Sequence, residues 1–600
     1  MPPAPPLHTL ADWRRAYAGG ASPLALLGAL RSHLSADDPA WILRVDRSFI
    51  DAQVALLPPA PTASTPLWGV PFAVKDNIDV AGLTTTAACP AFAYTAERSA
   101  TVVQRLQAAG AVLVGKTNLD QFATGLVGTR SPYGEVPNSF DGAYVSGGSS
   151  SGSASVVARG LVPLALGTDT AGSGRVPAGL NNLVGLKPTP GRVPMAGVVP
   201  ACRTLDVVSV FALTVADAAQ AMAIIEGAGD EPQFNQPVPQ AGWLGGHRVG
   251  LRLGVPQRAD CDAALGWDQA FDAAGVRAQA LGAELVPVDF TPLFEVARLL
   301  YDGPWVAERY TVVQALMTAR PEAMDATVRE IIAATGRFNA GDVYRAQYRL
   351  AELRRQLAPL WQQVDALMVP TTPTCPTRAA VSRSPLLRNS ELGRYTNFVN
   401  LLGLAALALP SAVPESGLPF GVTFVAPGGS DAALADWGLR WEAAGPATLG
   451  ARLRPARDGD RNPGGWPAAA ATLPLAVVGA HLEGMPLHGQ LVERGARLLA
   501  RTRTAPAYRL FALPGTVPPK PGLMRVAEGE PGHAIELELV EMPMAAVGSF
   551  LALIPAPLGL GTVQLEDGRW VKGFICEPAA LAGATDISAH GGWRAYLASR

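Results

Sequence analysis

Short apolar runs alternate with helix-like segments from about residue 67 onward. Runs of this length, bounded by glycines or polar turns, are typical of buried strands. The runs are GVPFAVK, AVLVG, LVPLALG, VSVFAL, VGLRLGVP, AELVPV and ALMVP. Helical patterns separate several of them, so we expect an α/β domain with a large, mostly buried sheet. Residues 9–60 precede this region and read as short helices with polar faces.

The pattern changes near residue 450. The segment 451–474, ARLRPARDGDRNPGGWPAAAATLP, is rich in Pro, Gly, Arg and Ala and has little periodicity, which is typical of a linker. Beyond it, LAVVGAHL, YRLFAL, AIELELVEM and TVQLEDGRWVKGFIC read mainly as strands, with a hairpin signal at EDG. We therefore expect a domain over 1–450, the linker, and a small β-rich domain over 475–600.

Composition narrows the functional classes. The chain is 48% hydrophobic and 16% charged, as expected of a folded protein, and its net charge of −2 gives no electrostatic case for nucleic acid. The longest apolar stretch, FVNLLGLAALALPSAVP, is too short to span a bilayer, so we expect no membrane association. The five cysteines are scattered and lack metal-ligand spacing, so we expect no metal site. Their odd number and the absence of a signal-peptide pattern at the start favour the cytoplasm.

Two loops rich in glycine and hydroxyl residues, GGSSSGS (147–153) and TDTAGSG (168–174), flank an apolar run. Taken alone, each is most simply a tight turn. A phosphate cradle of the P-loop type is disfavoured, because no lysine follows the glycines. A serine nucleophile is the third interpretation, and it needs a base. No histidine lies between residues 34 and 246, so Lys75 is the candidate base; otherwise it is a surface lysine at a strand end.

A family resemblance favours the third interpretation. GVPFAVKDNIDVAGLTTTAA, the block GGSSSGSASVVARGLVPLALGTDTAGSGRVPAGLNNLVGLKPTPGRVP, and GLPFGVTFVAP resemble the amidase signature family over roughly residues 20–440. The resemblance implies a large mixed central sheet flanked by helices and a Ser-cisSer-Lys triad. Lys75 matches the base, Ser149 the bridging serine and Ser173 the nucleophile. No cofactor is implied.

The resemblance also implies details of the two loops. The Gly148–Ser149 peptide is expected to be cis, and the apolar run between the loops to build a buried strand. Asp169 and Arg175 are expected to hold the second loop. The oxyanion would be bound by the backbone N–H groups of Thr170, Ala171, Gly172 and Ser173.

Three features resemble the allophanate hydrolases within this family. They are the loop TAGSGRVPAG, the segment NLDQFATGLVGTRSPYG and the appended β-rich domain. The substrate would be allophanate, whose carboxylate Tyr301 and Arg309 would bind, with Tyr301 just before a helix and Arg309 on its second turn. Gly125 would let the substrate approach the backbone. Without the resemblance, Arg309 is a helix-surface residue, Tyr301 a half-buried aromatic residue and Gly125 a turn glycine.

The β-rich domain resembles the gamma-glutamylcyclotransferase-like fold through LAVVGAHLEGMPLHGQL. His481 is its best catalytic candidate, for a decarboxylation step, with His488 and Glu541 weaker; a docking or dimerisation module without chemistry is the alternative. We expect a homodimer. A separate urea carboxylase would supply allophanate, because no Met-Lys dipeptide marks a biotin carrier. A silent scaffold, a general small-amide amidase and an amidotransferase-type subunit remain alternatives.

Overall fold

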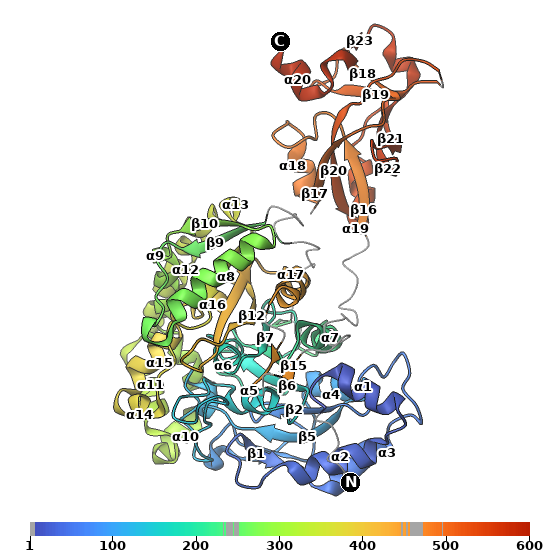
Figure 1. The fold of residues 1–600 in the computed structure, drawn as a ribbon. Helices are drawn as coiled ribbons and strands as arrows, with labels where there is room; N and C mark the ends of the chain where they lie inside the picture. The colour runs from blue at the N-terminus through green and yellow to red at the C-terminus, as the bar shows by residue number, and fades with distance from the viewer. Residues whose placement is uncertain are drawn as a thin grey trace. The chain divides into compact units, whose positions relative to one another are not determined.

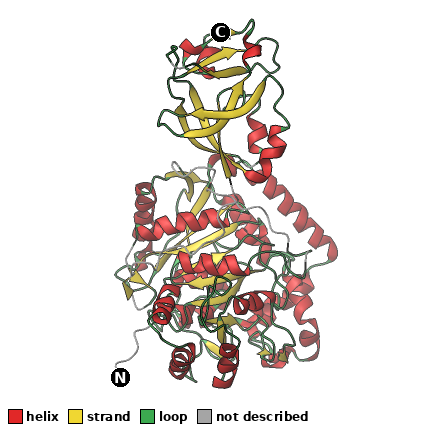
Figure 2. Cartoon of the chain, turned by 90° about the vertical axis from the view of Figure 1, so that its right-hand side faces the viewer, coloured by secondary structure: helices red, strands yellow, loops and turns green. Residues whose placement is uncertain are grey.

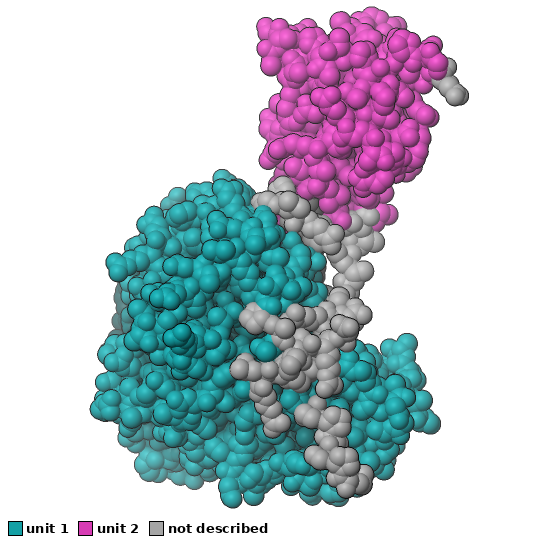
Figure 3. All heavy atoms as spheres, in the orientation of Figure 1, with its two compact units in different colours: residues 1–240, 251–466 teal, residues 241–250, 467–600 magenta. Residues whose placement is uncertain are grey.

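The chain forms two compact units (Figure 3), Met1–Gln240 with Leu251–Trp466 and Ala241–Gly250 with Pro467–Arg600. The computed structural model describes residues 7–231, 233–235, 244, 251–445, 448–451, 454–455, 472–494, 496–527 and 529–600. Most of the predicted linker, 451–474, therefore lies outside the described residues. No helix in the described ranges is long and apolar enough to cross a membrane.

The first unit is built on one eleven-stranded sheet (Figure 1). In spatial order its strands are β1 (Trp41–Arg44), β5 (Val112–Thr117), β2 (Pro71–Lys75), β6 (Leu164–Asp169), β8 (Val207–Ala212), β7 (Val184–Lys187), β12 (Ala405–Ala412), β13 (Phe420–Ala426), β11 (Ala366–Pro370), β9 (Arg252–Pro256) and β10 (Glu284–Val288). Parallel and antiparallel pairs both occur, which confirms the predicted large mixed sheet.

Helices flank this sheet (Figure 1). They are α1 (Leu10–Ala18), α2 (Pro23–His33), α3 (Arg47–Ala55), α4 (Thr101–Ala108), α5 (Ser151–Ala158), α6 (Val176–Leu180), α7 (Val215–Ile225), α8 (Trp267–Ala280), α9 (Thr291–Tyr301), α10 (Val306–Ala319), α11 (Ala326–Ala333), α12 (Ala340–Leu357), α13 (Leu360–Gln363), α14 (Arg378–Arg383), α15 (Pro385–Leu392), α16 (Phe398–Leu401) and α17 (Asp431–Ala443).

The run between the two serine loops differs from the prediction of a strand alone. Residues Ser151–Ala158 form α5, and only the following β6 is a strand. All eight residues of α5 are buried. A helix buried on every side carries no amphipathic period, so its sequence cannot be told from a buried strand.

Two neighbouring strands, β2 and β6, end at the same edge of the sheet and carry residues of the predicted site there. β2 and β6 are parallel neighbours, with Val74 opposite Leu166. Lys75 is the last residue of β2 and Asp169 the last of β6. Carboxyl ends of parallel neighbours leave a sheet at the same edge, where α/β sheets commonly bind ligands. Lys75 and the loop after Asp169 are therefore brought together by the sheet itself.

The second unit consists mainly of strands (Figure 2). A five-stranded sheet has the order β17 (Arg497–Arg503), β20 (Glu536–Pro543), β16 (Thr472–Val477), β22 (Trp570–Cys576) and β21 (Leu558–Gln564). A three-stranded sheet has the order β19 (Pro521–Arg525), β18 (Tyr508–Ala512) and β23 (Thr585–Asp586). Its helices are α18 (His488–Val492), α19 (Met544–Leu551) and α20 (Trp593–Ala598). The predicted small β-rich domain is confirmed.

Candidate active site

Lys75 is fully buried at the end of β2, whose five residues are all buried. Its Nζ donates hydrogen bonds to Oγ of Ser149 (2.7 Å) and to Oγ1 of Thr168 (2.8 Å). Burial lowers the pKa of Lys75 to about 7, although the charges of Asp120, Asp206 and Asp169 oppose the shift. A large share of this amine is therefore neutral at neutral pH, as a base requires.

Ser149 follows a cis peptide bond with Gly148, as the sequence predicts. A Cβ added at Gly148 would overlap Oδ2 of Asp120, so no larger residue fits there. The backbone N–H of Asp120 in turn donates to the carbonyl oxygen of Ser149 (3.1 Å). Ser149 is thus fixed between Asp120 on one side and the Lys75 amine on the other.

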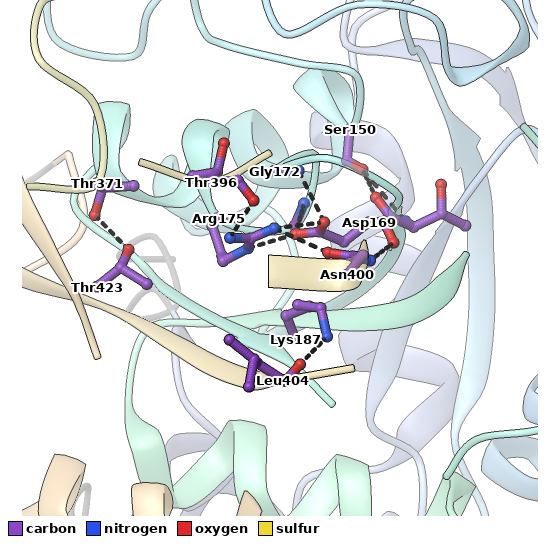
Figure 4. Close-up of polar contacts among 12 residues, drawn as sticks. Ser150, Asp169, Gly172, Arg175, Lys187, Thr371, Thr396, Asn400, Leu404 and Thr423 are labelled. Atoms are coloured by element: carbon purple, nitrogen blue, oxygen red, sulfur yellow. Dashed lines mark hydrogen bonds and ion pairs between the residues drawn. The ribbon is translucent and has the colours of Figure 1, made fainter. Parts of the chain in front are cut away.

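A buried ion pair fixes the loop that carries Ser173 (Figure 4). Asp169 accepts hydrogen bonds from Nε (2.8 Å) and Nη2 (2.9 Å) of Arg175, and both side chains are fully buried. Burial alone would raise the pKa of Asp169, but the Arg175 guanidinium, the Lys187 charge and the Gly174 N–H together hold that pKa below its usual range. Asn400 and Thr396 accept from Arg175, through Oδ1 (3.2 Å) and the carbonyl oxygen (3.1 Å) respectively. Asp169 and Arg175 hold the loop, as expected.

Ser173 lies in this loop with 2% of its surface exposed. Within the described ranges its hydroxyl makes no hydrogen bond. The backbone N–H groups of Thr170, Ala171 and Ser173 also have no acceptor there. The described structure therefore joins Lys75 to Ser149 but not Ser149 to Ser173, a contact that attack by Ser173 requires. The three unpaired amides are what oxyanion binding needs.

The Gly172 N–H was expected to bind the oxyanion, and the structure corrects this. Its N–H donates to Oδ1 of Asp169 (2.8 Å), so it is occupied within the loop. The reason is the turn itself, because the Asp169 carboxylate also accepts from the Gly174 N–H (3.0 Å) and closes the loop on both sides. Three of the four expected donors therefore remain for an oxyanion.

Tyr301 and Arg309 lie side by side, with the Arg309 Cζ atom 5.5 Å from the centre of the Tyr301 ring. Nη1 of Arg309 donates to Oγ1 of Thr124 (2.9 Å) and to the carbonyl oxygen of Ala123 (3.4 Å). Its Nη2 is buried without an acceptor in the described structure. Because α9 runs through Tyr301 and α10 begins at Val306, Tyr301 ends one helix and Arg309 lies in the first turn of the next. Arg309 therefore lies one turn earlier in its helix than expected, and Tyr301 precedes that helix but also ends another.

Gly125 lies beside Asp120. A Cβ at this glycine would come within 2.6 Å of Oδ2 of Asp120. The close approach that requires glycine is therefore to a side chain of the same loop.

Several residues of the site were not predicted from the sequence. Thr168 is the second partner of the Lys75 amine, Thr124 holds Arg309, and Asp120 supports Ser149. Asp206 accepts from the Thr170 hydroxyl (2.5 Å), and burial raises its pKa to about 6. Thr168 and Thr124 stand inside the quoted motifs, but letters of this kind do not tell which hydroxyl faces the site. Asp120 stands in the same quoted segment as Thr124, and the same reason applies to it, whereas Asp206 stands outside the quoted motifs.

His481 is half-buried in the second unit and stacks on Phe574, with ring centres 5.1 Å apart. Its Nε2 lies 3.0 Å from Oε1 of Gln490, and burial lowers its pKa. His488 contacts the carbonyl oxygen of His481 through Nδ1 (3.2 Å). His481 also lines a small cavity together with Lys520. The ring therefore favours the neutral form.

Metal chemistry has no support among the described residues, where no group of three His, Cys, Asp or Glu side chains could hold an ion. The polar groups of the site include a buried amine, the two hydroxyls that it contacts, and the Arg309 guanidinium, whose charge acts on that amine. This set is suited to acyl transfer.

The family model for amidases matches residues 49–435. The chain belongs to the amidase family. A second model, the allophanate hydrolase C-terminal domain, matches residues 473–598. Apart from residues 241–250, which are grouped with the second unit, the two matches fall on different compact units of the chain.

Relatives agree with this membership. The chain is 45% identical over 578 residues to a urea amidolyase of Saccharomyces cerevisiae, a match that covers 93% of this amidase and 31% of that protein. It is 36% identical to a glutamyl-tRNA(Gln) amidotransferase subunit of Prochlorococcus marinus, covering 66% of this chain and 86% of that one. The solved allophanate hydrolase of Kluyveromyces lactis is 43% identical, with a TM-score of 0.78 over 98% of this chain and 99% of that one. The amidase spans about a third of the length of the urea amidolyases that it matches.

Proposed function

We propose that this amidase hydrolyses allophanate in urea breakdown, through an acyl-enzyme on Ser173. The observation that carries the proposal is the buried Arg309, whose Nη2 has no acceptor in the described structure. A buried cationic donor without a partner is costly, and a substrate carboxylate would satisfy it. The similarity to the Kluyveromyces lactis allophanate hydrolase over nearly the whole chain supports the same substrate.

In the proposed reaction, Ser173 attacks the terminal amide carbonyl of allophanate. The hydroxyl proton passes to Ser149 and then to the neutral Lys75 amine, with which Ser149 shares a hydrogen bond. The free amides of Thr170, Ala171 and Ser173 would bind the oxyanion. Collapse of the tetrahedral intermediate breaks the C–N bond and releases ammonia, which takes a proton back through the relay. Water then cleaves the ester and frees N-carboxycarbamate, which loses carbon dioxide.

Replacing Arg309 with methionine should lower kcat/KM for allophanate by about 100-fold, because a hydrogen bond to a charged group and its charge are both lost. Hydrolysis of malonamide, a neutral amide, should fall by less than about threefold. Ammonia release from both substrates measures the effect, and Arg345→Met, at an exposed arginine, is the control. Equal losses on the two substrates would contradict carboxylate recognition by Arg309.

The pH profile of kcat/KM should rise through an inflection near 7 and level off above it. The sign follows from the base: Lys75 accepts a proton only when neutral, and burial lowers its pKa to about 7. Lys187 is the control, because burial also lowers its pKa to about 7 while its Nζ, within the described part of the chain, donates only to carbonyl oxygens. The inflection should persist in Lys187→Met. If it disappears in that variant, it reports the titration of Lys187 and not of Lys75.

For the second unit we propose that His481 assists the loss of carbon dioxide from the first product. Support comes from its neutral ring at the edge of a small cavity that Lys520 also lines, since an anionic product needs a nearby cation. A docking module is the alternative, and His481→Ala separates the two through the rate of carbon dioxide release. A separate urea carboxylase would supply allophanate. The homodimer and the cytoplasmic location stay predictions.

A further inference from the structure

Two arginines, not one, are buried beside Thr124. Arg309 and Arg130 are each 3% exposed. Nη1 of Arg309 donates to the Thr124 hydroxyl (2.9 Å), and Nη1 of Arg130 donates to the carbonyl oxygen of the same residue (2.9 Å). Thr124, itself fully buried, therefore links two guanidinium groups.

Neither guanidinium forms an ion pair within the described part of the chain. The other acceptors are carbonyl oxygens, Pro385 for Nη2 of Arg130 (3.0 Å) and Ala123 for Nη1 of Arg309 (3.4 Å). Nε of Arg130 and Nη2 of Arg309 are buried with no acceptor at all. Asp206 and Glu308 act on Arg309 through their charges without a direct contact, whereas buried cations normally have a contacting partner, so a donor is left for an anion that enters.

The loop that carries Thr124 is built to stay in place. Phe122 and Ala123 precede it in the left-handed region, with φ of +50° and +53°. The Asp120 carboxylate accepts the backbone N–H of Arg130 (3.0 Å) and closes the loop on itself. Its second oxygen also accepts the N–H groups of Val127 and Gly128. The hydroxyl and the carbonyl oxygen of Thr124 are thus both presented from a fixed backbone.

We propose that Thr124 and Arg130 are positioning residues that make Arg309 selective for a substrate carboxylate. The Thr124 hydroxyl occupies Nη1 of Arg309, which leaves Nη2 as the donor for the anion. The carbonyl of Thr124 holds the Arg130 guanidinium nearby, so its charge adds to the positive potential at that donor. This inference rests on the proposed function, since it concerns the anionic end of the same substrate.

The test is the steady-state kinetics of Thr124→Val and Arg130→Met on allophanate and on malonamide. Thr124→Val keeps the shape of the side chain and removes the hydroxyl, so KM for allophanate should rise about tenfold while kcat changes less than twofold. Arg130→Met should raise the same KM by a similar factor. Values for malonamide should stay within about twofold of the wild type for both variants.

Two further variants separate positioning from general damage. Thr124→Ser keeps the hydroxyl and should restore most of the allophanate KM. Thr423→Val removes a buried hydroxyl bonded to Thr371 and should leave the preference between substrates unchanged. If Arg130→Met does not fold, the two substitutions at Thr124 still decide the question.

Each other outcome overturns the inference in a recognisable way. Unchanged KM for allophanate in Thr124→Val, or equal losses on both substrates, would overturn the positioning role while the wild type still prefers allophanate. A wild type with no such preference would overturn the proposed function, and this inference with it.

Discussion

Lys75→Met should lower kcat/KM for allophanate by about 10³- to 10⁴-fold, the range that a general base contributes. The amine is the acceptor at the end of the proposed relay, and among the described residues its Nζ donates only to the hydroxyls of Ser149 and Thr168. Methionine has a similar length, so the buried space stays filled while the proton acceptor is lost. Ammonia release at pH 8, where the wild-type amine would be mostly neutral, measures the effect.

Lys187→Met is the matched control for this loss. Lys187 is also fully buried with a lowered pKa, but its Nζ donates to the carbonyl oxygens of Pro188 and Leu404. This variant should lose stability and keep activity within about tenfold. Thermal unfolding of both variants separates folding from chemistry. A Lys75→Met enzyme that retains a tenth of wild-type activity would remove Lys75 as the base.

Ser173→Ala should have the largest effect of all, a loss of about 10⁵- to 10⁶-fold in kcat, as in other enzymes that lose a serine nucleophile. The Oγ atom of Ser173 would form the ester bond, and alanine offers no atom that could form it. Rapid quenching followed by intact-protein mass spectrometry should detect an acyl adduct on the wild type and none on this variant.

Ser150→Ala is the control in the neighbouring loop. Its hydroxyl bonds the backbone of Thr168, as donor to the carbonyl oxygen (3.1 Å) and acceptor from the N–H (3.3 Å), and so serves the fold. Activity should fall by less than about tenfold, and the acyl adduct should persist. Full turnover by Ser173→Ala would remove the nucleophile assignment.

Much of the sheet could be predicted because its strands are short apolar runs punctuated by glycines. β2, β6 and β8 follow that rule, and all their residues are buried. α5 broke the rule, because a helix buried on all sides looks like a buried strand. β1 was missed inside a region of short helices, since its pattern WILR is only four residues long and three of them are partly exposed.

The residues of the candidate site also fall into two groups, those within a local motif, which could be predicted, and those from distant segments, which could not. Lys75, Ser149 and Ser173 stand in a motif, and the structure places the Lys75 amine on the Ser149 hydroxyl. The supporting residues come from distant segments: Asn400 donates to the carbonyl oxygen of Asp169 (2.8 Å) across 231 positions. No local pattern reports a contact of that kind, because it depends on which strands become neighbours in the sheet. Occupation of the Gly172 amide likewise depends on how one turn closes.

We propose that Ser173 is the nucleophile of a hydrolase and that the carboxylate of allophanate completes its site. The most direct measurement is ammonia release by the purified full chain from allophanate, malonamide and a simple fatty amide under identical conditions. We expect a kcat/KM for allophanate at least about 100-fold above that of either neutral amide. Comparable values for the three substrates would contradict it.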